Sequence, residues 1–260
     1  MGDNVWAMQT MVAVGADKIW AEDSGGAGPE LVLLHEGVGD ARMWDPIWPA
    51  VTDRFRVIRY DVRGYGRSPA PTENYTLLAD LQDVLAHFSV TSAHFAGCSM
   101  GGATAVELAL AEPDRVKSLV LLSPGISGYQ WPTEPEIDAE YGALAAAGDE
   151  EGLMQLCLRI WGAAGPDPFV TDLARSAVRA WASDDFEQEG EPSWGRLEEI
   201  RTPTVVMVGD KDKPALIDCD EQAAARIAGC TLIRMPGVDH YPTVRAPELV
   251  LRTIMSHCAG

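Results

Sequence analysis

The chain has 260 residues, 47% of them hydrophobic, which is enough for one substantial core and an inserted subdomain. Acidic residues outnumber basic residues by 39 to 20, and the formal net charge of −19 argues against nucleic acid or an anionic membrane as a partner. The five cysteines are scattered and form no C-x-x-C pair, which disfavours a disulfide framework or a zinc site and favours a reducing compartment.

The first half of the chain alternates short apolar runs with polar loops and helix-forming segments. The first six residues lack the basic and apolar regions of a secretory signal, and no run approaches the roughly 20 apolar residues of a membrane span, so we expect a cytoplasmic protein. Residues 10–22 predict a β-hairpin around a Gly-containing turn. Continuous apolar runs are typical of strands buried in a parallel sheet. These runs lie at 30–35, 55–60, 93–96 and 116–122, and helices are expected at 41–52, at 77–88 behind a Thr76 cap, and from residue 99 to about 112.

The pattern changes after residue 125. From 126 to 199 helical segments are separated by loops rich in Gly, Pro and acidic residues, and this shift predicts an inserted helical subdomain between core segments 1–125 and 200–260. The helices expected there are 137–147, 150–161 and 168–181; strands at 204–208 and 231–235 and helices at 219–228 and 247–258 follow. Alternating strands and helices predict an α/β fold, a mostly parallel sheet covered on both faces, with function at the carboxyl edge of the strands.

The most informative motif is Gly97-Cys98-Ser99-Met100-Gly101, a G-x-S-x-G pattern between a strand and a helix. A serine between glycines often marks nothing more than a turn, but here the strand–turn–helix context predicts a nucleophile elbow. Ser99 would then be exposed above the sheet at the positive end of a helix. Cys98, one residue earlier, should point away from the cleft and is interpreted as a small buried residue.

A serine needs a base and an acid to become a nucleophile, and two later loops offer them. His240 follows the 231–235 strand and is the candidate base; the histidine at the end of the 30–35 strand, His35, is interpreted as a core residue. Asp212 follows the 204–208 strand and is the favoured acid, with Asp210 as the alternative. The chain order Ser, Asp, His is the one expected when these loops converge at one sheet edge.

The oxyanion hole requires two backbone N–H donors directed at the developing charge. The residue after the nucleophile, Met100, supplies one. The second is expected from the loop after the first buried strand, with Gly37 favoured and Val38 as the second choice.

Together these residues resemble the α/β-hydrolase superfamily, over essentially the whole chain. The matching pieces are His35-Glu36-Gly37, the Asp61-x-Arg63-Gly64-x-Gly66-x-Ser68 loop, Gly97-x-Ser99-x-Gly101-Gly102, Gly209-x-x-Asp212 and Gly237-x-x-His240. The set is most similar to the small bacterial esterase, enol-lactonase and cofactor-free haloperoxidase branch. The resemblance implies an eight-stranded, mostly parallel sheet and a helical cap inserted after the sixth strand. Where the family usually has His-Gly, Glu36 intervenes; it could repel anionic substrates at the mouth or pair with an arginine.

The leading hypothesis is a serine hydrolase that cleaves a carboxylic ester or lactone of a small, largely apolar molecule through an acyl-enzyme, with no metal or organic cofactor. A C–C bond hydrolase, an amidase or a perhydrolase would use the same triad, and a small-molecule receptor would use the same fold. Serine at the elbow disfavours epoxide hydrolase and haloalkane dehalogenase activity, which the superfamily performs with Asp there. We expect a small-molecule substrate and a monomer or homodimer.

Overall fold

The computed structural model describes residues 8–181 and 184–259 of the chain; the first six residues, read above for a targeting signal, lie outside them. In the described part, eight strands form one sheet in the order β1-β2-β4-β3-β5-β6-β7-β8. The β1–β2 and β2–β4 pairs are antiparallel and the other neighbours are parallel. The strands are β1 (Met8–Val14), β2 (Asp17–Asp23), β3 (Glu30–Leu34), β4 (Arg56–Tyr60), β5 (Ala93–Cys98), β6 (Val116–Leu122), β7 (Thr204–Gly209) and β8 (Thr231–Met235).

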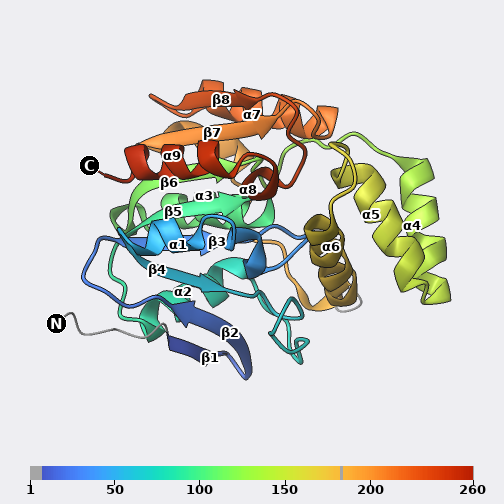
Figure 1. The fold of residues 1–260 in the computed structure, drawn as a ribbon, viewed down its shortest axis with the longest axis horizontal. Helices are drawn as coiled ribbons and strands as arrows, with labels where there is room; N and C mark the ends of the chain where they lie inside the picture. Colours follow the sequence, from blue (N-terminus) through green and yellow to red (C-terminus); the bar gives the residue numbers. More distant parts are fainter. Residues whose placement is uncertain (1–7, 182–183, 260) are drawn as a thin grey trace.

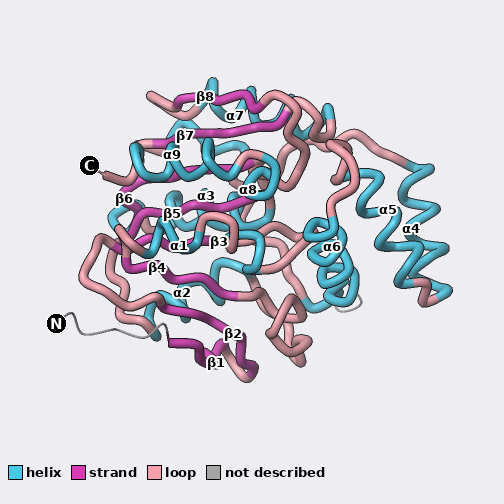
Figure 2. The backbone as a smooth tube through the Cα atoms, in the orientation of Figure 1, coloured by secondary structure: helices cyan, strands magenta, loops and turns pink. Residues whose placement is uncertain are grey.

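Helices cover both faces of this sheet (Figure 1). Alternate residues of one strand serve the two sides, since Val32 and Leu34 of β3 lie in one apolar cluster and Leu31 and Leu33 in the other. The first cluster includes residues of α2 (Leu77–His87), α3 (Met100–Ala111) and α7 (Pro214–Arg226); the second includes residues of α1 (Trp48–Thr52) and α9 (Pro247–His257). The predicted α/β fold with a mostly parallel eight-stranded sheet is therefore confirmed; Figure 2 shows the strands in magenta with the helices in cyan around them.

Two local predictions are wrong. The helix expected over 41–52 is broken into a 3₁₀ turn, η1 (Ala41–Trp44), and the short α1, because Pro46 lacks the N–H that a continuous helix would use. Helix α7 begins five residues before the expected position, with Pro214 at its first position. A short helix, α8 (Pro242–Arg245), lies between the loop that carries His240 and α9, where no element was predicted.

Besides two 3₁₀ turns, η3 (Asp184–Phe186) and η4 (Trp194–Glu199), the described residues between β6 and β7 form three α-helices: α4 (Pro135–Ala147), α5 (Glu150–Trp161) and α6 (Pro168–Trp181). Figure 1 shows them gathered at one end of the sheet, the end at which the parallel strands finish. The division of the chain into core and cap at residues 125 and 199 stays a prediction. None of the helices in the described residues combines the length and apolarity needed to cross a membrane.

Candidate active site

Ser99 occupies a strained turn between β5 and α3. Its backbone has φ 48° and ψ −115°, a region that a side chain rarely adopts, and it stands immediately before the first residue of α3. A Cβ on Gly97 would come 2.4 Å from the Gly101 carbonyl oxygen, and a Cβ on Gly101 would come 2.5 Å from the Leu34 carbonyl oxygen. The two glycines therefore allow strand and helix to pack closely enough to hold the serine in this conformation.

The structure brings Asp212 and His240 together. His240 Nδ1 lies 2.8 Å from Asp212 Oδ2, and both side chains are almost completely buried. Burial alone would raise the pKa of Asp212, but its pKa lies below the usual range because of His240 and the Lys213 backbone N–H. Asp210, the alternative acid, instead accepts a hydrogen bond from the Gly237 backbone N–H at 2.7 Å, and it is exposed.

The loop that carries His240 is fastened to the segment after α5. The His240 N–H donates to the Trp161 carbonyl at 3.2 Å, and the Ala164 N–H donates to Asp239 Oδ2 at 2.9 Å. Arg245 contacts the same Asp239 oxygen at 3.1 Å and the Gly165 carbonyl at 2.6 Å. These bonds tie the imidazole's position to the end of α5.

The indole of Trp161 links the histidine to the pocket that holds the serine. Its ring centroid lies 4.4 Å from that of His240. Trp161 and Ser99 both line one pocket of about 230 Å³. Ser99 thus lines a pocket whose wall includes Trp161, Trp161 packs on His240, and His240 contacts Asp212. The catalytic roles of Ser99, His240 and Asp212 stay a prediction.

The loop after β3 approaches the start of α3. A Cβ built on Gly37 would lie 3.8 Å from Met100 Sδ and 4.0 Å from Met100 Cβ, so the two predicted oxyanion donors are neighbours. The Gly37 carbonyl accepts a hydrogen bond from Trp181 Nε1 at 3.0 Å, which fixes this loop against the end of α6. The neighbouring Val38 carbonyl accepts from the Tyr241 hydroxyl at 3.1 Å.

His35 has both ring nitrogens occupied. Nε2 accepts from the Val62 backbone N–H at 3.0 Å, which assigns the proton to Nδ1, and Nδ1 then donates to the Glu36 carbonyl at 2.7 Å. The Glu36 carbonyl belongs to the same peptide unit as the Gly37 N–H. His35 therefore orients that N–H, a role that the sequence interpretation as a core histidine did not contain.

Glu36 lies in neither of the two places considered from the sequence. Its side chain is fully buried, and neither carboxylate oxygen accepts a hydrogen bond from another residue of the described chain. A Cβ on Gly39 would come 2.3 Å from Glu36 Oε1, which places the carboxyl against that turn. Burial raises the pKa of Glu36 to about 8, and the Asp40 carboxylate adds to the shift.

Two further residues of the pocket were not singled out from the sequence. Lys213 and Glu134 form an ion pair within it. The only sequence signal for Lys213 is that it directly follows Asp212; Glu134 is 79 positions away and carries no signal. Cys98 is buried, and burial raises the pKa of its thiol, in line with the structural interpretation.

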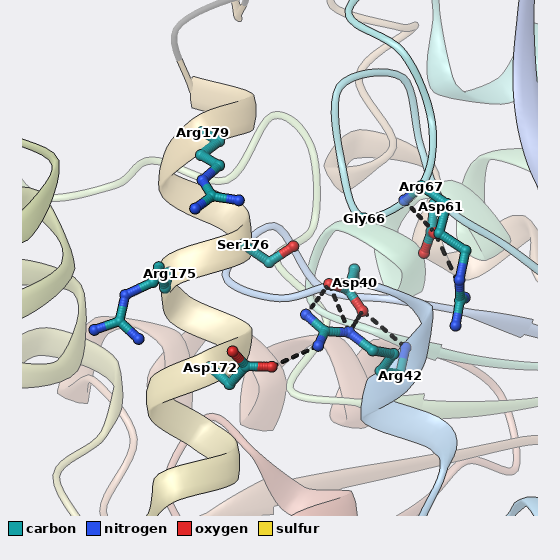
Figure 3. Close-up of a pocket in the computed structure, with 9 residues that line it drawn as sticks. All are labelled: Asp40, Arg42, Asp61, Gly66, Arg67, Asp172, Arg175, Ser176 and Arg179. Atoms are coloured by element: carbon teal, nitrogen blue, oxygen red, sulfur yellow. Dashed lines mark hydrogen bonds and ion pairs between the residues drawn. The ribbon is translucent and has the colours of Figure 1, made fainter.

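A larger polar cavity of about 390 Å³ lies between α6 and η1 and is not lined by Ser99 (Figure 3). Four arginines gather there, and each has a carboxylate within 4.0 Å. Arg42 contacts both Asp40, at 2.7 Å, and Asp172 of α6, at 2.5 Å. The arginines of this cavity are therefore paired with carboxylates, and the Arg42–Asp172 pair joins η1 to α6.

The chain matches the model of the alpha/beta hydrolase fold over residues 29–174. A protein of Caulobacter sp. (strain K31) that bears a carbamate hydrolase name, RutD, is 27% identical over 94% of this chain and 97% of its own. A pimeloyl-[acyl-carrier protein] methyl ester esterase of Methylococcus capsulatus is also 27% identical, over 92% of this chain and 98% of its own. The crystal structure of a hydrolase from Pseudomonas aeruginosa PA01 superimposes with a TM-score of 0.79 and 28% identity, covering 97% of this chain and 98% of that one.

Proposed function

The chain belongs to the α/β-hydrolase fold family, and we propose that it is a serine hydrolase that cleaves a carboxylic ester or lactone of a small molecule through an acyl-enzyme. One observation carries the proposal. Ser99, held at φ 48° at the start of α3, shares a pocket with Trp161, whose ring packs on a histidine bonded to a buried aspartate. Nucleophile, base and orienting acid are the three parts that such chemistry needs.

In the proposed reaction His240 Nε2 takes the proton of the Ser99 hydroxyl as the oxygen attacks the substrate carbonyl. The 2.8 Å contact from Nδ1 to Asp212 keeps Nε2 free to act as the base and stabilises the imidazolium that forms. His240 then gives the proton to the leaving alkoxide. A water activated by the same imidazole releases the acid in a second round, which restores Ser99.

The negative charge that develops on the carbonyl oxygen would be met by the Met100 and Gly37 N–H groups. Met100 begins α3, so its N–H is one of those with no partner inside the helix, and the helix dipole acts in the same direction. His35 holds the peptide that bears the Gly37 N–H through its Nδ1 contact to the Glu36 carbonyl. Removing one such donor typically costs about 10²–10³-fold in kcat.

A fluorophosphonate probe tests the proposal, because it reacts with an activated serine whatever the natural substrate. We expect labelling of the wild-type protein, and no labelling of Ser99→Ala or His240→Ala. Ser256→Ala is the matched serine control, and it should still be labelled, because the Ser256 hydroxyl lies in α9 and donates to the Thr253 carbonyl of its own helix. An unlabelled wild type, or a labelled Ser99→Ala, would contradict the proposal. Hydrolysis of short 4-nitrophenyl esters, compared with amides and carbamates, then identifies the bond that is cleaved.

A further inference from the structure

The pocket beside Ser99 is apolar except for one pair of opposite charges. Its lining is Ser99, Gly125, Trp131, Pro132, Glu134, Trp161, Lys213, Ala215 and Leu216. Lys213 is the only cation among these described lining residues, in a chain with a formal charge of −19. The ammonium group of a lysine in an apolar pocket next to a proposed nucleophile is suited to bind a negatively charged group of a ligand.

The position of Lys213 is set by the proposed catalytic acid. Its backbone N–H donates to Asp212 Oδ1 at 2.8 Å, and Pro214 then begins α7. The backbone of the lysine is therefore held by the carboxylate that orients His240. The side chain, 21% exposed, extends from this anchor into the pocket.

Trp161 places the ammonium close to the reacting atoms. The Lys213 Nζ lies 5.1 Å from the centroid of the Trp161 ring, and the same ring lies 4.4 Å from the His240 ring. One indole thus contacts both the proposed base and the cation. A substrate whose carbonyl is at Ser99 would have other atoms within reach of the ammonium, because the pocket holds only about 230 Å³.

Glu134 is a replaceable partner for this cation. It is the residue before α4, it contributes no backbone cap through its side chain, and its side chain is 37% exposed. The carboxylate side of this ion pair is open to solvent, where an ion pair contributes little to stability. A carboxylate that arrives with a substrate can therefore take the place of Glu134 on Lys213.

We propose that Lys213 is a specificity-determining residue that binds a carboxylate of the substrate, so that the enzyme prefers esters or lactones that carry a second, ionised carboxyl group. Glu134 occupies the ammonium when no substrate is bound. This inference rests on the proposed function and adds one charged contact to an otherwise apolar pocket.

The test compares two esters that differ in one carboxylate, methyl butyrate and monomethyl succinate, whose hydrolysis is followed by the acid released. The measured quantity is the ratio of kcat/KM for the succinate to that for the butyrate. For Lys213→Met we expect this ratio to fall about 10- to 100-fold, the range for a lost hydrogen bond to a charged group. The change should lie mainly in KM, because the contact is made in the ground state as well as in the transition state. Lys213→Arg should restore most of the ratio.

Two further variants separate a local contact from other effects. Lys211→Met removes the same charge from an exposed position in the same loop, and its ratio should stay within about twofold of wild type, because solvent screens a distant charge. Glu134→Gln removes the internal competitor, and its ratio should rise. If Lys213 and Glu134 only fasten α4 to α7, Lys213→Met and Glu134→Gln will each change kcat/KM for the two esters by the same factor, and the inference is wrong.

A second pair of esters, phenyl acetate and 4-acetoxybenzoate, carries the extra carboxylate on the alcohol side. A Lys213-dependent ratio in either pair supports the inference and identifies which part of the substrate the pocket takes; a ratio independent of Lys213 in both pairs overturns it. Failure of the proposed function looks different. In that case the wild type neither reacts with the fluorophosphonate nor hydrolyses any of the four esters.

Discussion

The loops after β3 and β7 each bring a buried carboxyl group to the same edge of the sheet, but the pKa values of the two carboxyl groups shift in opposite directions. After β7, Asp212 is met by His240 and by a backbone N–H, and its pKa lies below the usual range in spite of burial. After β3, Glu36 receives no hydrogen bond from another described residue, and its pKa rises to about 8. Burial alone does not decide the charge; the partners do. The lowered pKa favours the ionised form of Asp212, and the raised pKa favours the protonated form of Glu36.

The largest effect expected from this contrast concerns the partnered carboxyl. Asp212→Asn should lower kcat on a 4-nitrophenyl ester by about 10³- to 10⁴-fold. The amide would favour the wrong tautomer of His240, and it carries no charge to stabilise the imidazolium that forms during the reaction. Circular dichroism should show an intact fold. The control is Asp210→Asn, which alters the carboxylate bonded to Gly237 and should cost less than about tenfold. A larger loss in Asp210→Asn would transfer the role of the acid to Asp210.

The unpartnered carboxyl should appear in the pH dependence of stability. Because the pKa of Glu36 is raised from 4.5 to about 8 on folding, the folded state holds a proton that the unfolded state releases. The contribution of Glu36 to the free energy of unfolding is therefore greatest at low pH and is lost as pH rises from about 4.5 through about 8. The loss between pH 5 and pH 8 is about 3 kcal/mol.

Urea titrations of wild type and Glu36→Gln over this window measure the effect. Burial also raises the pKa of Asp220 and Glu107, so both proteins should lose stability with increasing pH. The difference in the free energy of unfolding between the two proteins isolates the effect of Glu36. The free energy of unfolding of the variant should rise relative to that of wild type as pH increases. Parallel curves would mean that Glu36 is ionised in the folded protein through a partner.

The smallest expected effect concerns two glycines, Gly209 at the end of β7 and Gly37 in the loop after β3. A Cβ on Gly209 would come 2.1 Å from the Val238 carbonyl oxygen, whereas a Cβ on Gly37 would meet its nearest atom, the Tyr65 hydroxyl oxygen, at 3.7 Å. Gly209→Ala should therefore lower the free energy of unfolding by about 1–3 kcal/mol through overpacking against backbone, and Gly37→Ala by less than half as much. Equal losses in denaturant titrations would show that the β8 loop moves aside freely.

Much of the fold could be predicted because its elements carry local signals. Continuous apolar runs indicated the buried strands of the parallel core, and Thr76 caps α2 as expected, with its hydroxyl accepting from the Ala79 N–H. The 41–52 segment was predicted wrongly because its helical periodicity was given more weight than Pro46, which interrupts the backbone hydrogen bonds.

Some residues of the candidate site could likewise be predicted from local signals, and others could not. Ser99, Asp212 and His240 could be named because each follows a strand, and parallel strands end at one edge. The ion pair of Lys213 with Glu134 could not, because nothing local links residues 79 positions apart. The environment of Glu36 was equally hidden, since whether a buried carboxyl finds a partner is decided by tertiary packing.

The bonds between the end of α5 and the His240 loop have a consequence for attempts to recombine this protein with its relatives. The segment from 126 to 199 lines the pocket through Trp131 and Trp161, so it is the natural piece to exchange when a new selectivity is wanted. The same segment supplies the carbonyls of Trp161 and Gly165 that support the 239–245 turn. A chimera that replaces the whole segment would change the lining of the pocket and also remove the bonds that hold His240, the proposed base. Crossover points that retain residues 161–165 would separate the two effects.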